Sequence, residues 1–261
     1  MKTSANFSKA SIEFLKKASR QKRDTWLDRN RDDYEKLIRT PLTHLAETVF
    51  EELRSLAPDY HFPRKGLGRM KRPSNWVQEG GGIYKSWMSY SAARPRTSRF
   101  ENNPNLYFMI DGDDDDDPVL VAGGLYMPSS QQLRKLREAI AYDASAFDEL
   151  FATKEFSKRF KGGFSRDKTA KRPPRGFDPN HERIDWLKLQ AFFVWRPYTI
   201  REFTSSSFAR LVAHDFKLIL KMNRLMEKVL SGKTMAVSPK PKRAKFRLEE
   251  LEIVAPRPMD F

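Results

Sequence analysis

The stretch NLYFMIDGDDDDDPVLVAGGLYM, residues 105–127, decides which fold we expect for this chain. Its two ends, NLYFMID and PVLVAGGLYM, are short apolar runs bounded by turn-forming residues, and they predict two strands. DGDDDDD, residues 111–117, lies between them and predicts a solvated hairpin loop. A calcium loop is the alternative, although the segment lacks the glycine and the terminal glutamate of a D-x-D-x-D-G-x5-E loop.

Helical patterns lie on the N-terminal side of this hairpin. Ser8 is expected to cap a first helix, and a second helical stretch begins near Asp24, with apolar residues at steps of three and four. Pro41 falls inside that pattern, so it should kink the helix or start a new one. Residues 58–104 are rich in proline, glycine and basic residues, and we expect them to be irregular.

The C-terminal side predicts further helices and one more strand. Ser129 or Ser130 should cap a helix, and AFFVW, residues 191–195, is a strand candidate. Two short helices are expected to start at Asp143 and Thr153, and a third should contain Trp186 and Leu187. The last helix should run from about Ser205 to a stop at Gly232.

Helices at both ends with strands between them predict the α+β class. We expect residues 1–230 to form a single domain, with N- and C-terminal helices around a central antiparallel or mixed sheet. Residues 231–261 are expected to be a basic, partly flexible C-terminal tail, because SPKPKRAKF carries proline and charge but little that can be buried.

Composition narrows the class of protein. The chain of 261 residues has 19 Phe and 5 Trp, enough to build a core, and its net charge is +15. No run of about 18 apolar residues predicts a membrane span, and the N-terminus does not resemble a signal peptide. The chain has no cysteine, which excludes disulfides, thiol catalysis and Cys-ligated zinc. We therefore expect a basic cytoplasmic protein without membrane contact.

Two segments resemble known sites superficially. GGFSRDKT, residues 162–169, places Asp167 where a phosphate loop needs glycine, and its charge would repel phosphate. His181, Glu182 and Asp185 resemble half of a zinc helix, but no third ligand has a recognisable spacing. Acidic residues at a helix start explain this pattern better. The sequence therefore predicts no metal site and no cofactor.

Residues 69–96 combine basic and aromatic side chains. The cations could bind phosphate while Trp76, Tyr84, Trp87 and Tyr90 stack on bases or sugars. The alternative is that these aromatic residues belong to the core and that the arginine stems cover them. The sequence leaves both interpretations open.

Several segments together resemble the widespread microbial family catalogued as domain of unknown function 2461, over residues 6–230. The matching positions are Phe7, Phe14 and Leu15; Trp26, Asn30 and Tyr34; Ala122 to Pro128 with Leu133, Arg137 and Ile140; and Arg172, Pro173, Arg175, Gly176, Phe177 and Asp178, followed by Leu187 and Lys188. The resemblance implies a cytoplasmic α+β domain with two polar loops, and it implies no reaction.

One segment departs from the family pattern R-x-x-R-D-x-R-F-S-x-D-K-x-P-Y-K. Arg69, Arg72, Tyr84 and Lys85 stand in comparable places. The substituted positions are Pro73 for Asp, Asn75 for Arg and Trp76 for Phe, and a glycine run replaces the D-K-x-P part. If this segment carries the activity of the family, the change puts that activity in doubt here.

Three functions are consistent with these patterns. The first is binding of a small anionic or phosphate-bearing ligand in a cationic cleft, with or without a reaction. Guanidinium forks bind carboxylate or phosphate in a bidentate manner. The candidate residues are Arg69, Arg72, Tyr84, Lys85, Arg172, Arg175 and Lys188.

The second function is nucleic-acid binding through the basic surface and the tail at residues 233–247, with affinity that falls steeply with salt. The third is a structural or partner-binding module. In that case Arg172 and Arg175 should pair with carboxylates of the same chain, such as Asp178 or Asp185. The oligomeric state does not follow from the sequence.

Overall fold

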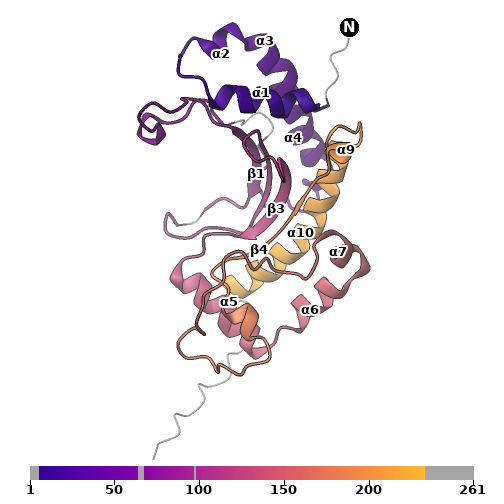
Figure 1. Ribbon diagram of the computed structural model, residues 1–261. Coiled ribbons are helices and arrows are strands. Elements are labelled where there is room, and N and C mark those ends of the chain that lie inside the picture. The colour runs from indigo at the N-terminus through magenta and orange to yellow at the C-terminus, as the bar shows by residue number, and fades with distance from the viewer. Residues whose placement is uncertain (1–5, 64–67, 97, 233–261) are drawn as a thin grey trace, which may run out of the picture.

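A four-stranded sheet forms the centre of the protein (Figure 1). The computed structural model describes residues 6–63, 68–96 and 98–232. The strands are β1 (Trp87–Ala93), β2 (Asn105–Asp111), β3 (Val119–Leu125) and β4 (Phe192–Pro197), which lie in sequence order with antiparallel neighbours. The α+β class is confirmed, and the sheet is antiparallel rather than mixed.

Strand β1 corrects the expectation that residues 58–104 are irregular. Its sequence WMSYSAA alternates, so Met88, Tyr90 and Ala92 are buried while the residues between them are more exposed. This alternation is typical of a strand with one face on the core. The basic and glycine-rich residues around it obscured the period-two signal.

Helices cover one face of the sheet and both of its ends. In chain order, the helical elements of the described residues are α1 (Lys9–Ser19), α2 (Trp26–Arg29), α3 (Arg31–Tyr34), the π-helical segment η1 (Glu35–Arg39), α4 (Thr40–Leu53), the 3-10 turn η2 (Ser74–Trp76), α5 (Ser130–Tyr142), α6 (Ser145–Ala152), α7 (Lys154–Arg159), α8 (Ile184–Leu187), α9 (Ile200–Phe203) and α10 (Phe208–Leu230). None of them is both long enough and apolar enough to cross a membrane.

Most expected helix starts are confirmed. Ser8, Ser129 and Thr153 are the N-caps of α1, α5 and α7. Pro41 lies within a helical stretch that runs without a break from Arg31 to Leu53, and the π-helical segment η1 comes just before it, so the regular α-helical geometry is interrupted beside the residue that has no N–H to donate. The sequence before α8 also offers Asp178 or Asn180 as a cap, but α8 begins only at Ile184 with Arg183 as its N-cap, and the Asp178 carboxylate accepts the N–H of Asn180.

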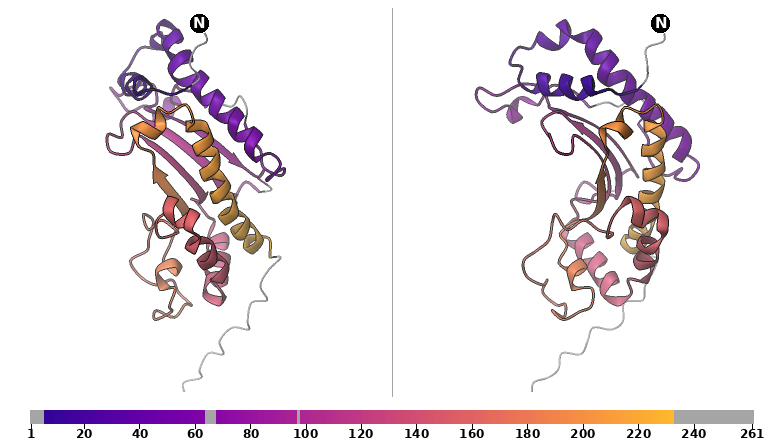
Figure 2. Two further views of the ribbon diagram at one scale, coloured as in Figure 1. Left: turned by 90° about the vertical axis from the view of Figure 1, so that its right-hand side faces the viewer. Right: turned by 45° about the vertical axis from the view of Figure 1, so that its right-hand side comes forward.

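Helix α10 crosses the covered face of the sheet and packs against β2, β3 and α4 (Figure 2). Its close approach depends on Gly123 in β3, because a Cβ there would lie 2.4 Å from Cγ2 of Ile219. Within the described part of the chain, the opposite face of the sheet carries no helix and forms the inside of a curved molecule (Figure 2). That open face is therefore where the sheet can meet a ligand.

Candidate functional site

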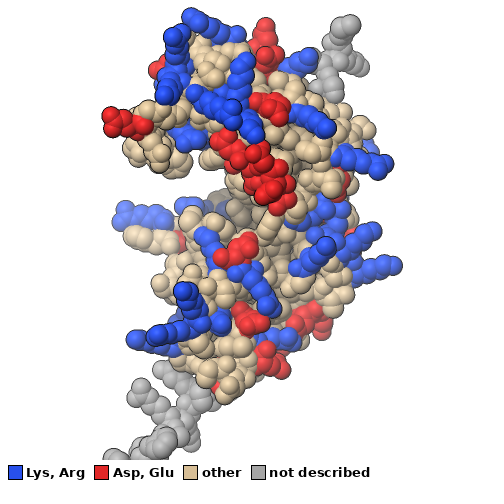
Figure 3. All heavy atoms as spheres, in the orientation of Figure 1, with Lys and Arg blue, Asp and Glu red and all other residues tan. Residues whose placement is uncertain are grey.

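A groove of about 730 Å³ lies on the open face of the sheet. Strand β3 forms its floor, and β2 and β4 form its sides. Figure 3 shows the surface hollowed between the part that contains α1–α3 and the part that contains α5. The groove is lined by Asn105, Tyr107, Met109, Asp114, Asp117, Leu120, Ala122, Gly123, Tyr126, Asp167, Lys168, Phe193 and Trp195.

The register of the sheet sets Tyr107 and Trp195 on either side of Ala122. Tyr107 pairs with Ala122 across β2 and β3, and Ala122 pairs with Trp195 across β3 and β4. Strands lie about 4.8 Å apart, so the backbones of the two aromatic residues are roughly 10 Å apart. All three residues line the groove, and Ala122 contributes only a methyl group between the two aromatic residues. A flat group that lies over Ala122 can contact both aromatic residues.

An ammonium group lies on an aromatic ring near each end of the open face. Lys168 Nζ is 3.7 Å from the centre of the Tyr126 ring, which packs edge-on against Phe193. Near the other end, Lys85 Nζ is 4.5 Å from the centre of the Trp87 ring. Partial burial, with a smaller contribution from Arg72, lowers the pKa of Lys85. Neither lysine has an ion-pair partner among the described residues.

The aspartate-rich hairpin loop closes one end of the groove. The Asp114 carboxylate accepts the N–H groups of Asp116 and Asp117, while Lys16 of α1 pairs with Asp115 at 2.6 Å. These contacts confirm the hairpin loop. Within the described part of the chain, no three His, Asp or Glu side chains are grouped as a metal site would need.

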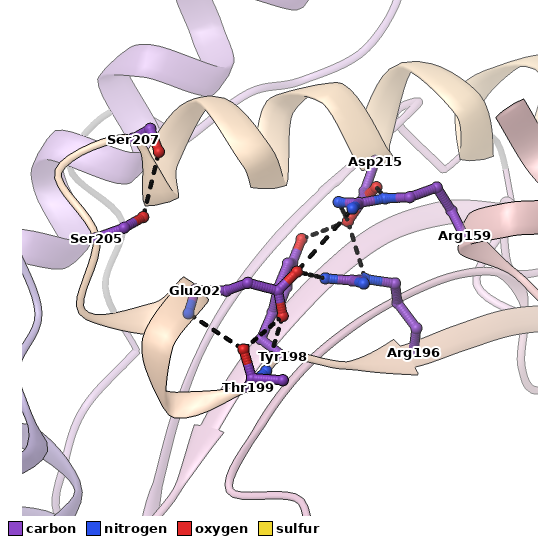
Figure 4. A network of polar contacts seen from close by, with 8 residues as sticks. All are labelled: Arg159, Arg196, Tyr198, Thr199, Glu202, Ser205, Ser207 and Asp215. Carbon is purple, nitrogen blue, oxygen red and sulfur yellow. Dashed lines mark hydrogen bonds and ion pairs between the residues drawn. The ribbon is translucent and has the colours of Figure 1, made fainter.

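Behind β4, a buried ion-pair network holds the strand against the helices (Figure 4). Asp215 of α10 has no exposed surface, and it accepts bonds from Arg159 Nε at 2.6 Å and from the Tyr198 hydroxyl at 2.7 Å. Arg196 Nε lies 3.2 Å from the same carboxylate, and Arg196 also bonds Glu202. Trp195, the neighbour of Arg196, projects into the groove from the other face of this anchored strand.

The sequence patterns considered above do not predict this network. The signal that could have revealed it is Asp215 itself, a charged residue within the mostly apolar buried stripe of α10. A carboxylate is rarely buried without cationic partners, so Asp215 predicted nearby arginines. The sequence could not show which arginines, because they come from α7 and β4.

Comparison with known proteins identifies the relatives of this chain. A family model described as "Conserved hypothetical protein (DUF2461)" matches residues 10–225. The chain belongs to the DUF2461 family. Neither the curated proteins nor the solved structures include one that this chain matches. Of the DUF2461 motif segments, Ala122 to Pro128 contributes most to the groove, since it supplies part of the floor and Tyr126.

The first polar loop of this DUF2461 member is the segment from Arg69 to Lys85, and it is only partly available to a ligand. Arg69 is exposed, whereas Arg72 Nε donates to the Tyr84 carbonyl at 2.9 Å. Tyr84 is 1% exposed, and its hydroxyl donates to the Asp24 carbonyl at 2.7 Å. Tyr84 thus has a structural role, and Lys85, half-buried over Trp87, is the cation that reaches the open face.

The second polar loop, which precedes and includes α8 and carries Arg172, Arg175 and Lys188, presents its cations to solvent. Arg172 and Arg175 are exposed, Lys188 is half-buried, and none of the three forms an ion pair with a described residue. Asp185 pairs with Arg166 at 3.2 Å instead. His181 uses both ring nitrogens, one near the Ala141 carbonyl and one accepting the Arg183 N–H, which agrees with a structural role.

The two loops lie at opposite ends of the sheet. Figure 1 shows the segment around residues 68–86 beside α1, and the segment around residues 168–190 beside α5. No hydrogen bond or ion pair of the described residues joins the two segments. Arg72, Tyr84 and Lys85 lie together, and Arg172, Arg175 and Lys188 belong to the other end. Ligand binding by these residues stays a prediction.

Proposed function

We propose that this DUF2461 member binds a small anionic ligand with a flat apolar body in the groove on the open sheet face. One observation carries the proposal, namely the cross-strand row of Tyr107, Ala122 and Trp195, which sets two aromatic residues on either side of a small one in the lining of the groove. Aromatic residues on both sides favour a planar, unsaturated group, because stacking adds to the gain from burial.

The charges of the groove limit the ligand to few negative charges. Lys168 is the cation of the lining, and its ammonium group can bind a carboxylate, sulfonate or single phosphate. Asp114, Asp117 and Asp167 also line the groove and would repel a chain of phosphates. We therefore place the anionic group of the ligand at the Lys168 end, away from the hairpin loop.

Nucleic-acid binding is the second candidate. The net charge of +15 and the exposed Arg172 and Arg175 favour it, whereas the three groove carboxylates oppose it. The basic tail assigned to this role lies outside the described residues. A partner-binding module is supported less, because the expected pairing of Arg172 or Arg175 with Asp178 or Asp185 does not occur among the described residues.

The experiment uses 8-anilinonaphthalene-1-sulfonate, a fluorescent probe with a flat aromatic body and one sulfonate. Ala122→Leu should place a larger side chain between the two aromatic residues and weaken probe binding at least roughly tenfold, since the rings lose access to the probe. Ser91→Leu is the matched control, because Ser91 is in the same cross-strand row, on β1, and does not line the groove. Equal binding by the wild type and both variants would count against the proposal.

A thermal-shift screen then searches for the natural class of ligand. Aromatic carboxylates, aromatic phosphates and nucleoside monophosphates are compared with short single-stranded oligonucleotides, because a ligand of the folded state raises the Tm. Displacement of the probe by a monoanionic aromatic compound supports the proposal. Salt-sensitive binding of oligonucleotides alone would favour the nucleic-acid function.

A further inference from the structure

A second hollow, of about 380 Å³, lies on the loop that joins α1 to α2. It shares no lining residue with the groove. Four of its lining side chains are cationic and none is acidic. The lining residues are Arg20, Gln21, Lys22, Arg23, Thr25, Trp26 and Arg29. The lining of the groove, in contrast, has one cation, Lys168, and three carboxylates.

In the part of the chain that the structure describes, the cations of this hollow form no ion pairs, although the charge of Arg20 adds to the hydrogen bond from Lys16 in lowering the pKa of Asp115 in the neighbouring hairpin loop. Within the described residues, no carboxylate lies at ion-pair distance from Arg20, Lys22, Arg23 or Arg29. The two acidic residues of the segment are engaged with cations outside the lining: Asp24 pairs with Lys71 at 2.7 Å, and Asp28 pairs with Arg31 at 3.7 Å. Like charges held together in this way repel each other, and an anion between them would relieve that repulsion.

The loop is held in place by the segment of residues 82–84. The Ile83 N–H donates to the Gln21 carbonyl at 2.8 Å. The buried hydroxyl of Tyr84 donates to the Asp24 carbonyl at 2.7 Å and accepts the Leu27 N–H at 3.3 Å. Gly82 approaches the end of α1 so closely that a Cβ would lie 1.6 Å from the Ser19 carbonyl oxygen.

Trp26 anchors the same loop from the inside. Its ring packs against those of Phe14 and Tyr84, at centre-to-centre distances of 5.4 and 5.6 Å, and Asn30 donates to its carbonyl at 2.8 Å. The backbone that carries the cations is therefore ordered before any ligand binds. An ordered backbone lowers the entropy cost of binding, because only the cationic side chains remain to be fixed by the ligand.

We propose that this hollow binds the diphosphate group of a free small molecule. Three guanidinium forks and one ammonium group match the several oxygens of adjacent phosphates, and guanidinium can bind phosphate in a bidentate manner. A single carboxylate would leave most of the four cations without a partner. Figure 3 shows Lys and Arg side chains gathered over the part of the surface that contains α1–α3, which would attract such an anion from solution.

The test measures binding of inorganic pyrophosphate by calorimetry at fixed ionic strength. We expect saturable binding to the wild type, and at least roughly tenfold weaker binding to R23Q/R29Q, because charge-assisted hydrogen bonds are lost. The control K36Q/R201Q removes two exposed cations that do not line the hollow, so it should bind as the wild type does. Each single variant is measured as well, in case the double variant folds poorly.

Measurements with other anions and with lipid vesicles test whether the hollow binds a free diphosphate or a phosphate group on a membrane. Orthophosphate and sulfate should bind more weakly than pyrophosphate, and vesicles of phosphatidylcholine with phosphatidic acid should not sediment the protein through this loop. Absent pyrophosphate binding, equal loss in R23Q/R29Q and K36Q/R201Q, or loop-dependent binding to vesicles alone would overturn the proposal. The groove is tested with a different probe and different variants, so either proposal can fail separately.

Discussion

The ammonium group of Lys168 lies 3.7 Å from the centre of the Tyr126 ring, at the end of the groove that Phe193 also lines. This contact keeps a positive charge beside an apolar surface. A cation over an aromatic ring is held by the electrostatic field of the ring, and such a contact is worth roughly 0.5–1 kcal/mol at an exposed site. Most of the charge thus stays available to an anion.

Replacing Lys168 should therefore affect binding more than stability. Lys168→Gln is expected to weaken binding of 8-anilinonaphthalene-1-sulfonate roughly tenfold, while the free energy of unfolding falls by about 1 kcal/mol or less. Fluorescence titration and urea unfolding measure the two effects. Lys161→Gln changes an exposed lysine outside the groove and should alter neither. Unchanged probe affinity in Lys168→Gln would show that the anionic group lies elsewhere.

The buried network behind β4 predicts a large loss of stability. Asp215→Asn should lower the free energy of unfolding by roughly 3–5 kcal/mol, because Arg159 and Arg196 would lose their buried counter-charge. Urea unfolding followed by tryptophan fluorescence measures this loss. Glu149→Gln removes an exposed carboxylate and should stay within about 0.5 kcal/mol of the wild type. A similar small effect for Asp215→Asn would contradict the network's role.

The close approach at Gly82 predicts a second destabilising change. Gly82→Ala would place a methyl group against the Ser19 carbonyl oxygen, so the backbone must move and the Tm should fall by several degrees. Calorimetry provides the measurement. Gly68→Ala is the matched control, since a Cβ there meets only the end of the Lys85 side chain at 3.9 Å. A wild-type Tm in Gly82→Ala would refute the packing described for this loop.

The ion pair between Asp59 and Arg224 predicts a pH dependence. Hydrogen bonds from Arg224 lower the pKa of Asp59 below its usual 3.8. A carboxyl whose folded-state pKa is lowered stabilises the fold above its usual pKa, and this contribution is lost as the pH falls through the folded-state value. Asp59→Asn should therefore lower the Tm at pH 7 and change it less near pH 3.

The control for this pH effect is Asp33→Asn, because Asp33 is exposed and forms no ion pair with a described residue. Thermal unfolding of the three proteins at several pH values makes the comparison. If the difference between the wild type and Asp59→Asn is the same at pH 3 and pH 7, the Asp59 carboxylate does not stabilise the fold through its charge.

Local patterns were enough to predict most of the secondary structure. The hairpin of β2 and β3, the caps Ser8, Ser129 and Thr153, and the long last helix all follow from signals within a few residues of one another. Such signals depend on backbone geometry and local hydrogen bonds, so they can be read without knowing the rest of the chain. Strand β1 was missed because its alternation lies within a basic, glycine-rich segment.

The candidate sites depend on contacts that local patterns do not contain. Tyr84 looked like a ligand donor, but burial under Trp26 makes its hydroxyl a support for the loop between α1 and α2. The basic residues of that loop were not recognised as a candidate site, because Asp24 stands among them in the sequence and only the fold engages it with Lys71. In both cases the interacting residues are far apart in the sequence, so local patterns do not show the contact.

The amino-acid pattern alone determined the α+β class, the family resemblance and the positions of most helices and strands, since these properties follow from periodicity, turn residues and caps. Tertiary structure decided which side chains face one another. The sheet register set Tyr107 and Trp195 on either side of Ala122, and helix packing buried Asp215 between arginines from other elements. These neighbours depend on packing between segments that are far apart in the sequence, so they cannot be predicted from short stretches of it.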